Sequence, residues 1–412
     1  MKLSSFIFQF SSLRSSFLRE WRRMTSRRIY LATAVVLPLF LLLFMATIFG
    51  DGQMRHLPIG IVDGDNTATS RSIVRHIAAV PTFDVVHHYA TDAEARAAVS
   101  RREVYGYLSI PPRFEESMVR GTDATLCYYY HYALLAVGGE VMSAFETALI
   151  PVRMAPIVSE ALMLGDTEAN IDTFLLPMTS DDHALYNPSL DYAEYLAVPI
   201  FYIMFQILVL LVTLYAIGND GRQTRLSLNE HNGNTLRAGV DNDMGSNIQK
   251  STFRIYALPL FTLIFSLEAM LANVVFFHWE HIPFEGHMGL FALTTVLFIV
   301  ATQSVAVILY ALFPRLSLVI SVVSMVGSLG ATLSGLTFPL SAMSPVVQYA
   351  AKLFPVRHFT EAMQSIVYFD GGLSACWPQL AVLCLFPLVA VGIVELKVRI
   401  RDPKRGITFL AE

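Results

Sequence analysis

The chain has 412 residues, of which 54% are hydrophobic and 15% are charged, and its formal net charge is −4 at pH 7. Soluble domains carry about 25% charged residues, so this composition excludes an ordinary soluble protein. It predicts a membrane protein whose main partner is the lipid bilayer. No nucleic-acid partner is expected.

Residues 1–28 predict an amphipathic helix on the cytoplasmic membrane surface. Apolar residues recur there at steps of three and four with arginines between them, namely Phe6, Phe10, Leu13, Phe17, Trp21 and Met24. The apolar run over residues 29–49 is longer than the core of a cleaved signal peptide. It therefore predicts an uncleaved first transmembrane helix.

Residues 50–190 predict an extracytoplasmic α/β domain. Strands are expected where β-branched and aromatic residues gather between turn formers, in HLPIGIVDGD, TFDVVHHY, VYGYLSIPP and ATLCYYYH. Helices are expected between them, and Thr91 with Glu94 has the spacing of a capping box. Such alternation favours a small α/β layer. A longer helical segment, residues 132–164, leads back towards the membrane.

Two groups of polar residues resemble metal sites, but the simpler interpretation is favoured for each. Residues 63–66, Asp-Gly-Asp-Asn, offer carboxylates to a cation, yet Asx side chains at a strand end favour a turn followed by a helix cap. Zinc is the alternative for His87 with His88 and for a trio further on, but no cysteine partners lie near them in the sequence; the trio is His278, His281 and His287. No metal site and no catalytic residue are predicted.

Residues 191–412 predict a domain of five transmembrane helices. Five apolar runs are each about long enough to cross a bilayer, at residues 195–218, 255–277, 288–313, 316–339 and 376–394. Lys and Arg gather in the first 28 residues, between the second and third spans and after the last span, which places both termini and the loop 219–251 in the cytoplasm. The fold class expected is therefore membrane α-helical, with six transmembrane helices and the α/β domain between the first two.

Glu268 is the only charged residue inside these runs. An intramembrane carboxylate marks either a polar contact with a neighbouring helix or vestibule, or a proton relay, and the first is favoured. The sequence contains no G-x-x-x-x-G-K-[ST] phosphate loop and no G-x-S-x-G elbow. The chain is therefore expected to be no enzyme and to bind no cofactor itself.

An interrupted apolar segment between the fifth and sixth runs carries a family resemblance. SGLTFPLSAMSPVVQYAAKLFPVRHFTEAM resembles the Ser-Gly, Phe-Pro, Met-x-Pro, Phe-Pro series of permease subunits of type 2 ABC exporters, in the bacterial branch with a large extracytoplasmic domain. LPIGIVDGDNTATSRSI and YNPSLDYAEYLAVP are similar to two other parts of such permeases. The resemblance covers nearly the whole chain.

In that family the corresponding segment, here residues 340–375, dips into the outer leaflet and turns back. The residues implied are Ser334, Gly335, Phe338, Pro339, Met343, Pro345, Phe354 and Pro355. The prolines at 345 and 355 would bound a short helix over residues 346–354. Such a re-entrant segment is possible only where its free backbone groups are buried in protein or face water. An external amphipathic segment is the alternative.

The resemblance also implies partners. Two ATPase subunits of the ABC type, which bind ATP and Mg, would dock on the cytoplasmic loop, at Asp220, Arg222, Gln223, Thr224, Arg225 and Glu230. Gln223 and Thr224 stand where relatives have Gly-Thr. A second permease copy or paralogue completes the pair, and this branch often works with a periplasmic adaptor and an outer-membrane channel.

The function expected is ATP-driven export of an amphipathic, lipid-like or drug-like substrate from the cytoplasm or the bacterial inner membrane. An ion-gradient-driven transporter is one alternative, for which Glu268 would be the natural site. A membrane receptor that binds a ligand with its extracytoplasmic domain is the other.

Overall fold

The computed structural model describes residues 17–18, 21–22, 24–50, 54–120, 122, 124–163, 187, 191, 193–218, 258–313 and 316–401. Contacts divide the chain into two compact units. The first unit combines Met1–Gly50 with Asp191–Glu412, and the second is Asp51–Leu190. Each unit is described by itself below.

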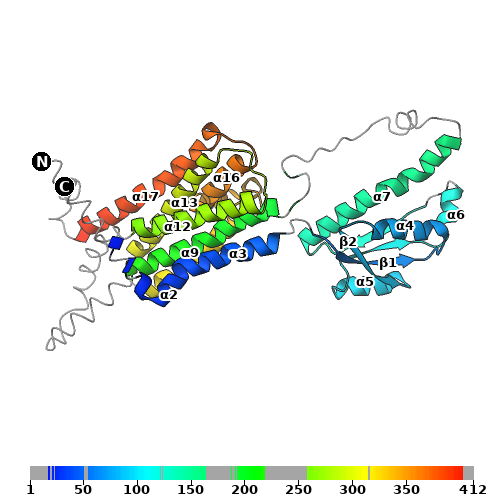
Figure 1. The fold of residues 1–412 in the computed structure, drawn as a ribbon, viewed down its shortest axis with the longest axis horizontal. Helices are drawn as coiled ribbons and strands as arrows, with labels where there is room; N and C mark the ends of the chain where they lie inside the picture. Colours follow the sequence, from blue (N-terminus) through cyan, green and yellow to red (C-terminus); the bar gives the residue numbers. More distant parts are fainter. Residues whose placement is uncertain are drawn as a thin grey trace. The chain divides into compact units, whose positions relative to one another are not determined.

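Five described helices of the first unit are long and apolar enough to cross a membrane (Figure 1), namely Arg28–Phe49, Ala193–Gly218, Leu258–Trp279, Met288–Leu312 and Leu373–Lys397. In order, they contain α2 (Arg28–Leu31), the π-turn η1 (Ala32–Val36) and α3 (Leu37–Phe49); η2 (Ala193–Ala197) and α9 (Val198–Gly218); α12 (Leu258–Val274) and η4 (Val275–Trp279); α13 (Met288–Leu312); and α17 (Leu373–Arg401). Each contains a predicted apolar run almost entirely.

The remaining predicted span, residues 316–339, is shorter than expected. Helix α14 (Leu316–Thr332) has 17 residues and ends before the predicted limit. At 1.5 Å per residue it is roughly 26 Å long, somewhat less than the hydrocarbon core of about 30 Å. Three short elements follow: η5 (Leu340–Ala342), α15 (Pro345–Ala351) and α16 (Pro355–Val367). The count of six spans stays a prediction.

The second unit is built on a four-stranded mixed sheet of order β2-β1-β3-β4 (Figure 1). Its strands are β1 (Leu57–Asp63), β2 (Phe83–Tyr89), β3 (Gly106–Ile110) and β4 (Cys127–Tyr130), all within the predicted segments. β1 is parallel to β2 and β3, and β4 runs antiparallel to β3. The helices are α4 (Ala68–Ala78), α5 (Asp92–Ser100), α6 (Phe114–Val119) and α7 (Leu135–Met163).

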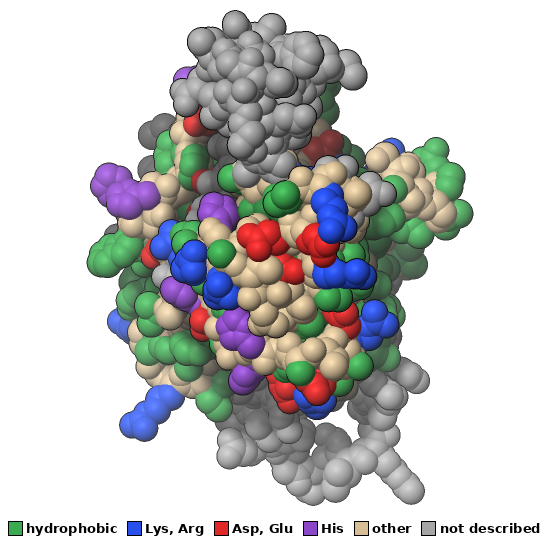
Figure 2. All heavy atoms as spheres, turned by 90° about the vertical axis from the view of Figure 1, so that its right-hand side faces the viewer, with side chains coloured by type: hydrophobic (Ala, Val, Ile, Leu, Met, Phe, Trp, Pro, Cys, Tyr) green, Lys and Arg blue, Asp and Glu red, His purple; other side chains and the backbone are tan. Residues whose placement is uncertain are grey.

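The two faces of this sheet bury different cores. Ile59 and Ile61 pack with residues of α4 and α7, including Ile77 and Phe145. Val62, one position further along β1, packs with residues of α5 and β3 on the other face. Alternation along the strand produces this division. Figure 2 shows one side of the molecule, on which acidic, basic and histidine side chains are interspersed.

Residues 63–66, at the end of β1, form a turn and provide a helix cap, which is the interpretation that the sequence favoured over a cation site. The Asp63 carboxylate accepts hydrogen bonds from the N–H groups of Asp65 and Asn66, at 3.1 and 3.0 Å. Asp65 in turn accepts from the N–H groups of Phe114 and Glu115, at 2.9 and 3.1 Å, and thereby caps α6 from a distant part of the chain. Thr91 caps α5 as predicted, while the Glu94 carboxylate accepts from Ala90 N–H.

Replacing Asp65 with Ala is expected to destabilise α6 by about 1 kcal/mol, because two N–H groups lose their acceptor. Burial by itself raises the pKa of Asp65, but hydrogen bonds from the Thr67 hydroxyl and from the N–H groups of Glu115 and Phe114 outweigh it and lower the pKa. The contribution is therefore complete above the unfolded pKa of about 3.9 and is lost as the pH falls through the lower folded value.

Hydrogen exchange at the Phe114 and Glu115 amides, in the full chain, measures this effect. Exchange should be faster in Asp65→Ala than in the wild type near neutral pH, and the difference should shrink below about pH 4. Asp84→Ala removes an exposed carboxylate from β2 and serves as the control. Equal protection in all three proteins at neutral pH would show that Asp65 does not cap α6.

Candidate functional site

The predicted coupling residues lie outside the described part of the chain. Asp220, Arg222, Gln223, Thr224, Arg225 and Glu230 all fall between the end of α9 at Gly218 and the start of α12 at Leu258. Their role stays a prediction. The described candidates lie in the segment after α14 and in the helices around it.

Helix α14 ends in a turn built by Ser334 and Gly335. The Ser334 hydroxyl donates to the Ala331 carbonyl at 2.8 Å and accepts from the Leu336 N–H at 3.3 Å. Gly335 has a φ of +84°, a left-handed conformation that is unfavourable for residues with a Cβ. These two residues therefore explain why the helix stops short of the predicted residue 339.

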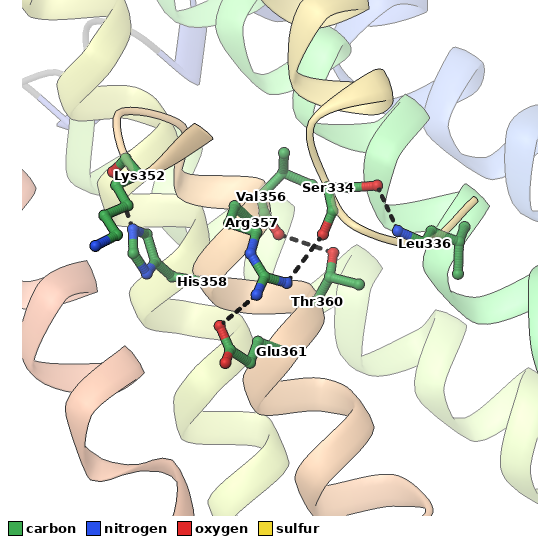
Figure 3. A network of polar contacts seen from close by, with 8 residues as sticks. All are labelled: Ser334, Leu336, Lys352, Val356, Arg357, His358, Thr360 and Glu361. Atoms are coloured by element: carbon green, nitrogen blue, oxygen red, sulfur yellow. Dashed lines mark hydrogen bonds and ion pairs between the residues drawn. The ribbon is translucent and has the colours of Figure 1, made fainter. Parts of the chain in front are cut away.

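Arg357 ties this turn to α16 (Figure 3). Its guanidinium donates to the Ser334 carbonyl at 3.3 Å and forms an ion pair with Glu361 at 3.0 Å. The Arg357 side chain is 18% exposed, whereas the Glu361 side chain is 44% exposed, so solvent screens the acidic end of this pair. Tyr195, at the start of the second span, donates to the Leu336 carbonyl at 2.6 Å. Two distant segments, α16 and the start of the second span, thus donate hydrogen bonds to the backbone of one turn.

The predicted helix over residues 346–354 needs a correction. α15 begins at Pro345 and ends at Ala351, because Phe354 is extended, as is usual before a proline. Pro345 and Pro355 each occupy the first turn of a helix, where a missing N–H has no cost. Met343 and Pro339 flank η5, and the Met343 carbonyl accepts from the Gln348 amide at 2.9 Å. Phe338 is half exposed.

Helix α16, not recognised in the sequence as a separate element, packs among the long helices. It lies against α13 and α17 and buries Val356, Phe359, Met363 and Ile366. Those positions recur at steps of three and four, so the hydrophobic periodicity of the sequence indicates this helix. The Phe359 ring stacks on Phe298 at 4.3 Å between centroids. The Tyr368 hydroxyl, directly after α16, donates to the Glu194 carbonyl.

A second polar cluster joins three long helices and was not predicted. The Tyr202 hydroxyl of α9 donates to Asn273 of α12 at 2.5 Å, and Tyr202 is fully buried. Thr262 of α12 donates to Gln303 of α13 at 2.6 Å. Interhelical hydrogen bonds of this kind stabilise helix packing in lipid. Their residues are uncharged, so composition alone did not distinguish them from other polar positions.

Glu268 lies near the middle of the Leu258–Trp279 helix and is only 8% exposed. Neither carboxylate oxygen has a hydrogen-bond partner among the described residues. The favoured hydrogen bond to a neighbouring helix is therefore absent from this part of the structure. A buried carboxylate in this position has a strong need for a proton or a cation.

Comparisons with known proteins agree with this architecture. A family model described as "ABC-2 family transporter protein" matches residues 28–227 and 251–394. The probable multidrug ABC transporter permease YbhR of Escherichia coli is 21% identical over 377 residues, which cover 91% of this chain and 92% of that protein.

The inner membrane transport permease YhhJ of Escherichia coli is 28% identical over 145 residues. This match covers 34% of the chain and spans only 35% of the length of YhhJ. The family model, by contrast, covers most of the sequence, on both sides of residues 228–250. The chain therefore belongs to the ABC-2 family of transporter proteins, as a membrane-spanning permease.

Proposed function

We propose that the chain is the permease subunit of an ATP-driven exporter in a bacterial inner membrane, moving amphipathic, lipid-like or drug-like molecules outwards from the cytoplasm or the membrane. The observation that carries the proposal is the family match, which extends across all five long apolar helices. The printed name of YbhR, a probable multidrug permease, supports the substrate class. Both termini and residues 219–251 face the cytoplasm in this proposal, and residues 50–190 lie outside.

Helix α14 supplies a polar face suitable for a transport pathway. Four hydroxyl residues recur on one face at steps of three and four and are exposed, namely Ser321, Ser324, Ser328 and Thr332. Each donates to the carbonyl four residues earlier, at 3.0 to 3.4 Å. Hydroxyls satisfied in this way are tolerated in lipid and still accept hydrogen bonds from a passing polar group. A second permease copy or paralogue would complete the pathway.

Energy for transport would come from partner ATPases, because the sequence contains no phosphate-binding loop of its own. Residues 219–235 would contact the ATPase and pass its closure on ATP binding to α9 and α12, the helices on either side. The turn after α14 would be tied to the start of the second span by Tyr195 and to α16 by Arg357. A periplasmic adaptor and an outer-membrane channel would extend the route.

Affinity purification from mild-detergent membranes, with mass spectrometry and an ATPase assay, tests this function. We expect an ABC-type ATPase to accompany the chain. The double charge reversal Arg222→Glu/Arg225→Glu should reduce both its recovery and its turnover, because it replaces two positive charges with negative ones at the proposed contact. Lys250→Glu, in the same loop but outside residues 219–235, is the control. A chain purified repeatedly without an ATPase would favour the gradient-driven alternative, for which Glu268 is the specific observation.

A further inference from the structure

Glu268 occupies a flank of α12 that differs from the flank holding the polar cluster. Phe261 and Phe265 lie seven and three residues before it, on the same helix face. The Phe261 ring is 5.4 Å from Tyr30 of the first span, and Phe265 is 5.8 Å from Phe205. Helix α12 packs against η1 and α3 of that first span. Helix geometry therefore places Glu268 on the same side of α12 as Phe261, which contacts the first span, and Phe265, which contacts Phe205 of α9.

This position lies at the border between the packed and the exposed surface of α12. Leu267 and Leu271, immediately before Glu268 and three residues after it, are 62% and 47% exposed. In a helix whose outer side contacts lipid, those residues face the bilayer. A molecule dissolved in the membrane therefore approaches the flank that carries Glu268 from the side of Leu267 and Leu271, and the polar cluster lies on another flank of α12.

The surroundings favour an organic cation over a metal ion. Calcium requires about six to eight oxygen ligands, and no group of three or more Asp, Glu, His or Cys side chains suitable for a metal occurs in the described ranges. Aromatic faces attract quaternary or delocalised cations, and a carboxylate without a partner supplies the opposite charge. A buried ionised carboxylate is costly until such a charge arrives.

We propose that Glu268, flanked by Phe261 and Phe265, receives the positively charged group of a lipid-dissolved amphiphile between α12 and the first span. The proposal rests on the transport function above and specifies its substrate class as cationic amphiphiles. Glu268 is then a specificity-determining residue. Neutral amphiphiles would use the same route without this contact.

Binding of radiolabelled tetraphenylphosphonium to the purified permease–ATPase complex in lipid nanodiscs tests the proposal. Glu268→Gln should weaken binding by about tenfold or more, because the amide keeps the shape but loses the charge. Glu268→Asp, which keeps the charge, should retain most of the affinity. Glu280→Gln, an acid-to-amide change beyond the end of the same helix, should bind like the wild type. Unchanged binding by Glu268→Gln would overturn the proposal.

A second measurement uses the unaltered chain and does not depend on how the variants fold. Dicyclohexylcarbodiimide, an apolar reagent for carboxyl groups in membranes, should label Glu268, as read by mass spectrometry of the peptide. Tetraphenylphosphonium should protect Glu268 from labelling, whereas uncharged triphenylphosphine oxide should not. Equal labelling with and without the cation would contradict the proposal.

The exporter function and the cation site at Glu268 are tested independently of each other. If the complex contains an active ATPase and the cation does not protect Glu268, the exporter stands and the cation site is wrong. If no ATPase accompanies the chain but the isolated permease in nanodiscs shows cation protection, the site stands and the ATP-driven function is wrong. Protection by sodium ions in place of the organic cation would assign the residue to an ion gradient and overturn the amphiphile proposal.

Discussion

Replacing Phe359 with Ala is expected to lower the free energy of unfolding by about 3 kcal/mol, within the range for large-to-small changes in a packed core. Phe359 is 1% exposed, and its ring lies 4.3 Å from Phe298 of α13 and 4.6 Å from Tyr202 of α9. Lipid is as apolar as this core, so the loss comes from packing contacts and the cavity left behind. Thermal unfolding in nanodiscs measures it.

The matched control for this change is Tyr349→Ala on α15. Tyr349 is 71% exposed and contacts Lys352, whose ammonium lies 5.2 Å from the ring centroid. Losing an exposed contact of this kind costs up to about 1 kcal/mol. Similar unfolding temperatures for Phe359→Ala and Tyr349→Ala would show that α16 is not held among the long helices.

A Gly286→Ala variant is expected to detach the loop after η4 from the end of α16. A Cβ at residue 286 would lie 2.1 Å from the Ile366 carbonyl oxygen, a backbone atom that cannot move alone. The neighbouring hydrogen bond from Glu285 N–H to the Val367 carbonyl, at 3.0 Å, should then break. Overpacking of this kind costs about 3 kcal/mol at the upper end of its usual range.

Gly289→Ala, three residues later, is the control, because a Cβ there meets nothing within 4 Å. It should be neutral or slightly stabilising, since Ala is the better helix former in α13. Hydrogen exchange at the Glu285 amide separates the two variants locally, and unfolding temperature does so globally. An unchanged Glu285 amide in Gly286→Ala would mean that the loop and α16 do not meet as described.

The parts of this protein that depend on local pattern were predictable. A run of about 20 apolar residues is stable in a bilayer as a helix, which satisfies its own backbone hydrogen bonds. The five long described helices therefore follow from the distribution of apolar residues along the sequence. Alternating and β-branched residues predicted all four strands, and Thr91 predicted the start of α5. Turn chemistry predicted the role of Asp63, although not that Asp65 would cap α6 some 50 residues away, at Glu115.

The elements that depend on long-range contacts were not predictable in the same way. The prolines at 345 and 355 were predicted to bound one short helix, whereas Pro355 begins a second helix, α16, which packs against α13 and α17. Arg357 donates to the Ser334 carbonyl, which lies 23 residues before it in the sequence. The end of α14 at Thr332 reflects the left-handed Gly335, which the apolar run alone conceals.

By itself the sequence determined that the chain is a membrane protein, where its five long described helices lie, and that it resembles a transporter permease. Those features follow from solvent preference and local motifs, which each segment carries alone. Only the tertiary structure decided that Glu268 is buried and that its carboxylate has no hydrogen-bond partner among the described residues. Helix rotation sets which side chains meet, and it results from packing between segments that are distant in the sequence.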